Sequence, residues 1–176
     1  YVYAKARDKL YVNLFVSGTG TVNMKDNAVK VQQVTGYPWD GSVKLTVEPQ
    51  RAAKFTVAIR VPGWAQGQPV PSDLYRYMDG GEQKVGLKLN GEVIEADMEG
   101  GYLCIQRKWA KSDVIEMALP MPVRRVLANQ NVEADRGRVA IERGPIVYCA
   151  EWPDNGGHVH NLVLPDNAKL TLEGRK

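Results

Sequence analysis

Apolar and polar residues alternate along most of this chain with a period of two. The run Leu10–Val16 places four apolar side chains on one face, and the alternation returns at Val43–Val47 and Phe55–Val61. Each run is bounded by glycine, proline, asparagine or aspartate, which supply turns. No segment of helical length carries apolar residues at helical spacing. The pattern predicts an all-β protein with almost no α-helix.

The later strands are short and closely spaced. Asn90-Gly91 lies inside the alternating segment Val85–Ile94 and suits a type I′ turn, so this segment predicts a tight hairpin. Further candidate strands are Tyr102–Gln106, Val114–Leu119, Val123–Leu127, Val139–Glu142, Ile146–Cys149 and Asn161–Leu164. About ten to twelve short strands in this length are typical of an antiparallel β-sandwich, which we expect to be jelly-roll-like.

One sandwich domain is expected over residues 1–152. A polar, glycine-rich tail at residues 153–176 follows it, or begins a further β segment. The segment Pro62–Gln83 shows no strand pattern and is long for a loop of a compact domain, which favours a functional or docking loop. The chain opens in mid-strand at Tyr1, without a methionine or a signal-peptide pattern, which favours a piece of a longer protein.

Composition narrows the function classes. The net charge of +3 arises from well-mixed basic and acidic residues, and no basic run is interleaved with aromatics, which argues against nucleic-acid binding. No apolar stretch is long enough to cross a bilayer, which argues against a membrane protein. Cys104 and Cys149 match no metal-ligand spacing and lie in apolar contexts, so we expect buried free thiols. A disulfide between them would require adjacent strands.

Two clusters carry groups that could do chemistry. Glu133 and Asp135 would share one face if extended, and glycosidases commonly use two carboxylates on either side of a sugar bond, but alternating charges usually mark a solvated strand face. His158 and His160 have the spacing of two metal ligands on a strand, yet no acidic or thiol partner lies at matching spacing. The serines lack a nucleophile-elbow motif. We therefore predict no catalytic and no metal-binding residue in this chain.

The tryptophans indicate a covered surface. Trp109 follows an alternating strand and is expected in the core or at a corner. Trp39, Trp64 and Trp152 lie in turns beside proline or glycine, where a large apolar ring is not expected to be left bare. The cover is either a ligand or another domain.

Seven motifs, in this order, resemble the C-terminal β region of the β-L-arabinofuranosidase family of glycoside hydrolases, family 127. They are LYVNLF at 10–15, TGYPWDG at 35–41, RVPGWA at 60–65, LNGE at 89–92, GY at 101–102, LPMP at 119–122 and RGPIVY at 143–148. The resemblance implies a β-sandwich that follows an (α/α)6 catalytic barrel. It also implies that the barrel holds a cysteine nucleophile, a zinc ion bound by cysteines and a glutamate, and a glutamate acid/base. None of those positions maps onto this sequence, so no cofactor is expected in this chain.

The resemblance suggests a role for the TGYPWDG turn. We expect Tyr37 and Trp39, with Trp64, to form one partly exposed patch that docks on the chain's own N-terminal barrel. Direct sugar contact, with Asp40 as the polar group, and purely internal packing are the alternatives. The runner-up function is a carbohydrate-binding module that holds polysaccharide through its turn tryptophans. An immunoglobulin-like adhesion domain is a third possibility.

Overall fold

The prediction of an all-β sandwich is confirmed by the structure. A computed structural model describes residues 1–78 and 83–173. This part of the chain contains fifteen strands, more than the sequence pattern predicted, and three short 3₁₀ helices. None of its helices is long and apolar enough to cross a membrane.

The first sheet has five strands. In spatial order they are β1 (Tyr3–Ala6), β2 (Lys9–Val12), β6 (Ala53–Arg60), β11 (Tyr102–Trp109) and β10 (Asp97–Glu99). Neighbouring strands are antiparallel except for β2 and β6, which run parallel. The parallel pair arises because the chain leaves this sheet after β2 and returns to it only at β6.

The second sheet has six strands, all antiparallel to their neighbours. In spatial order they are β3 (Gly18–Met24), β4 (Asn27–Thr35), β5 (Ser42–Pro49), β12 (Asp113–Ala118), β8 (Gly86–Leu89) and β9 (Glu92–Val93). Asn90 and Gly91 connect β8 to β9 with φ of 53° and 88°. Positive φ at both residues is what a type I′ turn requires, so the predicted hairpin is confirmed.

A single apolar core lies between these two sheets. Alternate side chains of both sheets point inward, as the period-2 pattern predicted, and the completely buried ones include Leu10, Leu45 and Ile115. The prediction was wrong for the end of the run Leu10–Val16: β2 ends at Val12, and beyond it Leu14 and Val16 are exposed. Trp109 is also completely buried, and its indole Nε1 donates a hydrogen bond to the carbonyl oxygen of Phe55 at 2.9 Å. Trp109 is therefore a core residue, as expected from the strand before it.

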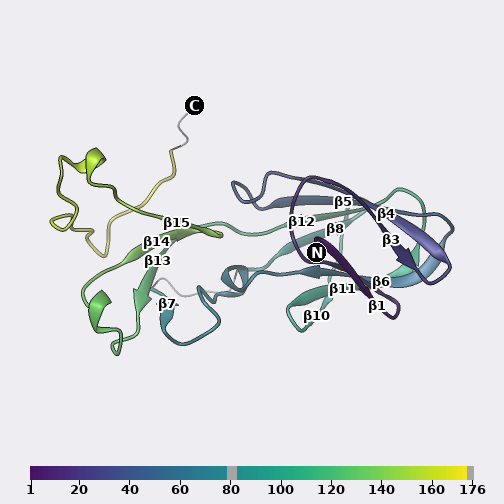
Figure 1. The fold of residues 1–176 in the computed structure, drawn as a ribbon, viewed down its shortest axis with the longest axis horizontal. Coiled ribbons are helices and arrows are strands. Elements are labelled where there is room, and N and C mark those ends of the chain that lie inside the picture. Colours follow the sequence, from purple (N-terminus) through teal and green to yellow (C-terminus); the bar gives the residue numbers. More distant parts are fainter. Residues whose placement is uncertain (79–82, 174–176) are drawn as a thin grey trace.

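A third, four-stranded sheet lies beyond one end of the sandwich (Figure 1). Its spatial order is β15 (Ile146–Tyr148), β14 (Ala140–Arg143), β13 (Val123–Ala128) and β7 (Tyr75–Tyr77). The strand β7 belongs to Pro62–Gln83, which was expected to contain no strand; of that segment, residues 79–82 lie outside the described residues. The expectation was wrong because β7 is only three residues long and is stabilised by pairing with the distant β13.

Three further sequence-based expectations need correction. Asn161–Leu164 forms no strand, and the tail is described only by turns and the helix η3 (Pro153–Asn155). Glu133–Asp135 forms a 3₁₀ helix, η2, and is not extended. Cys149 is an exposed free thiol because it follows the edge strand β15, whereas the free thiol of Cys104 is partly buried, and burial raises its pKa.

Candidate functional site

The TGYPWDG motif forms a tightly closed turn between β4 and β5. The backbone N–H of Trp39 donates to the carbonyl of Gly36 at 2.9 Å, and the Asp40 carboxylate accepts from the N–H of Ser42 at 2.8 Å. The hydroxyl of Ser42 donates to the same carboxylate. A methyl group at Gly36 would lie 2.0 Å from the Asp40 carboxylate, so a larger residue there would displace this side chain from its place in the turn. The motif therefore encodes a rigid turn.

The aromatic side chains of the turn have different environments. Tyr37 is partly buried and packs edge-on against Phe15, with ring centroids 5.5 Å apart. The ring of Trp39 is 73% exposed. Its backbone is nevertheless fixed, because Nη1 of Arg143 donates to the Trp39 carbonyl oxygen at 2.8 Å. Since Arg143 ends β14, this bond joins the sandwich to the third sheet.

The electrostatic environment of Asp40 favours its ionised form. Its pKa is held below the ordinary value, first by the hydroxyl of Ser42, then by the N–H of Ser42, and to a smaller extent by the charge of Arg143. A general acid needs the opposite shift, so that it carries a proton near neutral pH. Asp40 is thus an ionised hydrogen-bond acceptor that closes the turn.

Trp64 lies in the 3₁₀ helix η1 (Gly63–Gln66), which follows the last strand residues of β6. The turn at 35–42 and η1 both lie at the end of the sandwich that faces the third sheet (Figure 1). The Trp64 ring is partly buried against the core, and its Nε1 is buried without an acceptor in the described part of the chain. Among the described residues, ring contacts join Tyr37 to Phe15 but not to Trp39 or Trp64.

The other predicted candidates have structural partners. Asp135 accepts a hydrogen bond from the hydroxyl of Tyr75 at 3.0 Å, and this bond raises the pKa of Tyr75. Glu133 pairs with Arg136 across 3.4 Å at the surface.

The tail histidines are exposed at the surface. His158 and His160 are both exposed, and the ring of His160 lies edge-on to Trp152 with centroids 5.7 Å apart. Trp152 is itself 53% exposed.

The zinc ion implied by the family resemblance does not fit the residues that the structure describes. Cys104 lies in β11 of the first sheet, whereas Cys149 follows β15 of the third sheet. The described residues contain no group of three or more His, Cys, Asp or Glu side chains that could hold a metal ion.

One polar cluster was missed by the sequence analysis. In the third sheet, the buried Tyr77 donates its hydroxyl proton to the buried carboxylate of Glu142, and Arg124 lies 4.3 Å above the Tyr77 ring. Burial is the main cause that raises the pKa of both Tyr77 and Glu142. The sequence did indicate part of this cluster, because the charged residues Arg124 and Glu142 each lie inside a predicted strand. Tyr77, however, lay in a segment interpreted as loop.

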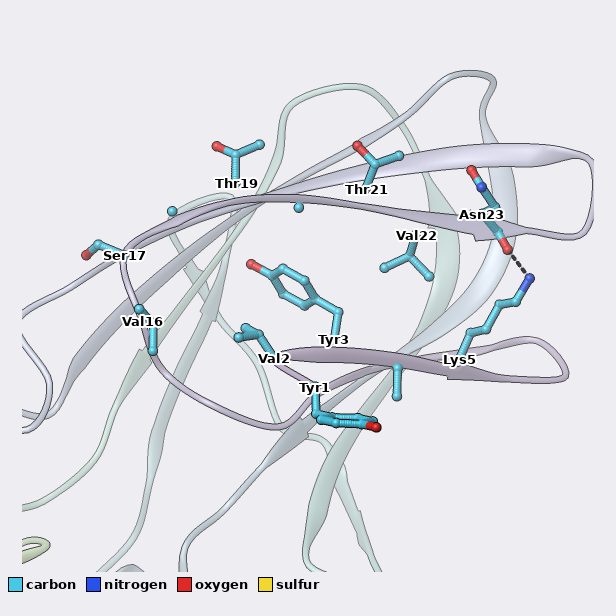
Figure 2. Close-up of a pocket in the computed structure, with 13 residues that line it drawn as sticks. Tyr1, Val2, Tyr3, Lys5, Val16, Ser17, Thr19, Thr21, Val22 and Asn23 are labelled. Atoms are coloured by element: carbon cyan, nitrogen blue, oxygen red, sulfur yellow. Dashed lines mark hydrogen bonds between the residues drawn. The ribbon is translucent and has the colours of Figure 1, made fainter.

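A cleft of about 630 Å³ runs between β1 and β3 (Figure 2). The ring of Tyr3 points from β1 toward β3 and occupies the space beside Gly20, where a Cβ would lie 2.6 Å from the ring. The side-chain amide of Gln33 donates to the Tyr3 hydroxyl at 2.9 Å and to the Leu14 carbonyl at 3.2 Å. Burial raises the pKa of Tyr3. The cleft is thus lined by the fixed Tyr3, by Tyr1 and by small, uncharged side chains, with Lys5 at one end.

Comparison with known proteins identifies relatives over nearly the whole chain. A family model described as "Beta-L-arabinofuranosidase, GH127 middle domain" matches residues 9–121, and one described as "Glycoside hydrolase family 127 C-terminal domain" matches residues 123–174. A curated non-reducing end beta-L-arabinofuranosidase from Bifidobacterium longum subsp. longum is 34% identical over 143 residues, which are 80% of this chain and 19% of the relative.

Solved structures agree with this similarity. A GH127 beta-arabinofuranosidase is 47% identical, with a TM-score of 0.82, over 87% of this chain and 24% of its own. A GH127 beta-L-arabinofuranosidase from Geobacillus stearothermophilus T6 is 38% identical, with a TM-score of 0.82, over 96% of this chain and 24% of its own. The chain therefore spans about a fifth of the curated relative and about a quarter of each of these two solved chains.

Proposed function

This chain belongs to glycoside hydrolase family 127, the β-L-arabinofuranosidase family, and we propose from that premise that it is the non-catalytic β portion of a longer hydrolase. The observation that carries the proposal is the succession of a middle-domain match and a C-terminal-domain match along a chain about a quarter as long as its solved relatives. In this proposal the chain packs on a preceding catalytic part, an (α/α)6 barrel, and stabilises it.

The carboxylates of the described residues support a non-catalytic role. Most glycosidases use two carboxyl groups roughly 5–10 Å apart on either side of the sugar bond, whereas the family resemblance implies a cysteine nucleophile with a glutamate acid/base. Asp40, Asp135 and Glu142 each accept a hydrogen bond from a fixed hydroxyl, and they lie in three separate settings. Each is thus used to hold the fold together, and the zinc and acid/base chemistry of the family is assigned to the preceding part.

The end of the sandwich that carries the turn is proposed as one contact with that part. Trp39 supplies an exposed ring on a rigid backbone, and such a ring loses little conformational freedom on docking. Tyr37 anchors the turn by packing on Phe15, Asp40 closes the turn through Ser42, and Trp64 lies at the same end of the sandwich.

Activity measurements test the non-catalytic role. The full-length protein, the protein without this chain and this chain alone are assayed on a panel of nitrophenyl glycosides that includes arabinofuranosides. We expect turnover by the full-length protein, none by this chain, and a lower thermal transition temperature for the protein without it. Clear turnover by this chain alone would refute the proposal.

The role of Trp39 is tested in the full-length protein with Trp39→Ser and a matched control, Trp152→Ser. Both rings are exposed, but only Trp39 lies in the turn. We expect Trp39→Ser to lower the transition temperature and Trp152→Ser to leave it nearly unchanged. If Trp39→Ser instead abolishes saturable polysaccharide binding and leaves stability intact, the turn is a carbohydrate contact.

A further inference from the structure

One edge strand of the sandwich lacks the features that normally prevent strand pairing. Natural edge strands are short, charged, bulged or interrupted by proline. Three edges of the sandwich follow this rule: β1 carries Lys5, β9 is two residues long and carries Glu92, and β10 carries Asp97 and Glu99. The fourth edge, β3, is seven residues long, with the sequence GTGTVNM and no charge or proline.

The register of the hairpin shows which backbone groups of β3 face outward. Met24 and Asn27 close the two-residue turn to β4, so they form a hydrogen-bonded pair, and hydrogen-bonded pairs then recur at every second residue. The outward groups therefore belong to Thr19, Thr21 and Asn23. In agreement, the carbonyl of Asn23 accepts a hydrogen bond from Lys5 of β1. From this register, the N–H and C=O groups of Thr19 and Thr21 lie on the edge of β3 that borders the cleft.

Apolar side chains surround the beginning of this edge. Val16 is 56% exposed and Val34 is 57% exposed, and a pair of hydrogen bonds between Ser17 and Thr35 fixes their segments side by side. Tyr1 lines the same cleft, and its carbonyl accepts a hydrogen bond from the side-chain amide of Asn13. The polypeptide that precedes Tyr1 in a longer protein must therefore arrive beside the start of β3.

We infer that an extended segment of the part preceding Tyr1 in the full-length protein adds to the free edge of β3 as a further strand. Its backbone pairs with Thr19 and Thr21, and its side chains cover Val16 and Val34. Strand addition uses main-chain hydrogen bonds for affinity and neighbouring side chains for specificity, which suits an uncharged, glycine-rich edge. This inference rests on the proposed function, because it names where the preceding part of the hydrolase engages this chain.

Hydrogen exchange in the full-length protein tests the pairing. We expect the amides of Thr19 and Thr21 to exchange at least about 100-fold more slowly than the amide of Val93, which faces outward from the opposite edge strand β9. Equal rates at these positions overturn the inference. Protection that disappears when the protein is diluted identifies a second copy as the occupant and also overturns it.

Two proline variants provide a matched perturbation. Thr21→Pro and Val93→Pro each remove an outward amide from an exposed position of an edge strand. We expect Thr21→Pro to lower the transition temperature of the full-length protein clearly more than Val93→Pro. If Thr21→Pro does not fold, the exchange measurement on the wild-type protein still decides whether a strand pairs with β3.

The same experiments separate this inference from the proposed function. Slow exchange confined to another face, such as the turn at 35–42, overturns strand addition to β3 and leaves the accessory role standing. If deleting this chain changes neither the stability nor the exchange of the preceding part, the proposed function itself fails.

Discussion

The sandwich and the third sheet bury different kinds of side chain. The apolar core cluster consists entirely of residues between Leu10 and Leu119, all in or near the first two sheets. The third sheet buries Tyr77 and Val126 but also the charged Arg125 and Glu142. Burial of apolar area is non-directional, whereas a buried polar network is favourable only when its partners meet with correct geometry. The sandwich thus contributes more to the free energy of unfolding, and the third sheet depends more on individual polar contacts.

The third sheet is also tied to its surroundings by arginines. Arg143 donates to the carbonyl of Trp39 in the sandwich, and Arg125 donates to the carbonyl of Ala168 in the tail. Four short strands without an extensive apolar core are expected to need such attachments. This comparison predicts that mutations in the two regions differ in size and in how far their effects spread.

The largest effect is expected from Trp109→Ala. The substitution removes a completely buried indole and its hydrogen bond to the Phe55 carbonyl, so the free energy of unfolding should fall by about 3–5 kcal/mol. Urea denaturation of this chain measures the loss. Trp39→Ala is the control, and its exposed ring should cost this chain less than about 0.5 kcal/mol. Similar losses for the two variants would contradict a stability centred on the sandwich core.

Tyr77→Phe should have a smaller and more local effect. It leaves the buried Glu142 carboxylate without its tyrosine donor, which should cost about 1–3 kcal/mol. Limited proteolysis is expected to accelerate within residues 123–148 and to remain slow in the sandwich. Tyr148→Phe, at an exposed position of the same sheet, is the matched control. If the sandwich opens together with the third sheet, the two regions are one cooperative unit.

The same tyrosine predicts a response to alkaline pH. Burial first, and then Glu142, raises the pKa of Tyr77 above its ordinary value of 10.0. A raised folded-state pKa contributes stability that is complete below pH 10.0 and is lost as the pH rises through the folded value. The pKa values of Tyr3 and Tyr75 are also raised, so tyrosinate absorbance should show more than one late ionisation. The latest of these should belong to Tyr77 and should accompany opening of the third sheet. That component should be missing in Tyr77→Phe; its persistence would assign the late ionisation elsewhere.

Arg143→Ala tests the attachment between the two regions. Loss of the bond to the Trp39 carbonyl should cost about 0.5–1.5 kcal/mol. We expect faster hydrogen exchange in the turn at 35–42, while the interior strands of the sandwich are unchanged. Arg138→Ala removes an exposed guanidinium from the same region and serves as the control. Equal exchange in both variants would mean that the turn is held by the sandwich alone.

The smallest effect is expected from Asp40→Asn, because the carboxylate is exposed. Donors from Ser42 lower the pKa of Asp40, so its contribution is present above the ordinary value of 3.8 and is lost as the pH falls through the lowered value. The amide proton shift of Ser42, followed by NMR during acid titration, should report this loss. In Asp40→Asn the shift should no longer titrate; a titration that remains would exclude Asp40 as its source.

The sequence predicted the sandwich better than the third sheet for a physical reason. In the strands that face the core, burial of alternate residues imposes a period of two that can be read directly. The strand β7 shows no such period, because three residues cannot establish one and β13, its partner, lies about fifty positions away. The helix at Glu133–Asp135 was misread for a related reason: alternating charges do not distinguish a solvated strand from a short turn of helix.

In the candidate site, too, local contacts could be predicted from the sequence and contacts between distant residues could not. The TGYPWDG motif was interpreted correctly as a turn, because the residues that close it, Gly36, Asp40 and Ser42, lie within seven positions of the chain. The partner of its backbone could not be predicted, since Arg143 lies 104 positions away along the chain. Nor did the pattern distinguish the exposed Trp39 from the partly buried Tyr37, which differ only in what the fold brings against them.

By itself, then, the sequence determined the all-β class, the Asn90-Gly91 hairpin, the apolar faces and the family resemblance. These features depend on local backbone preferences, on periodicity and on motifs that are contiguous in the chain. Tertiary structure alone decided the assembly of the third sheet, the burial of Tyr77 with Glu142, and the exposure of the β3 edge. Each of these features depends on contacts between segments that are distant in the sequence. The free energy of such contacts depends on how the segments are positioned in three dimensions, which no single stretch of sequence specifies.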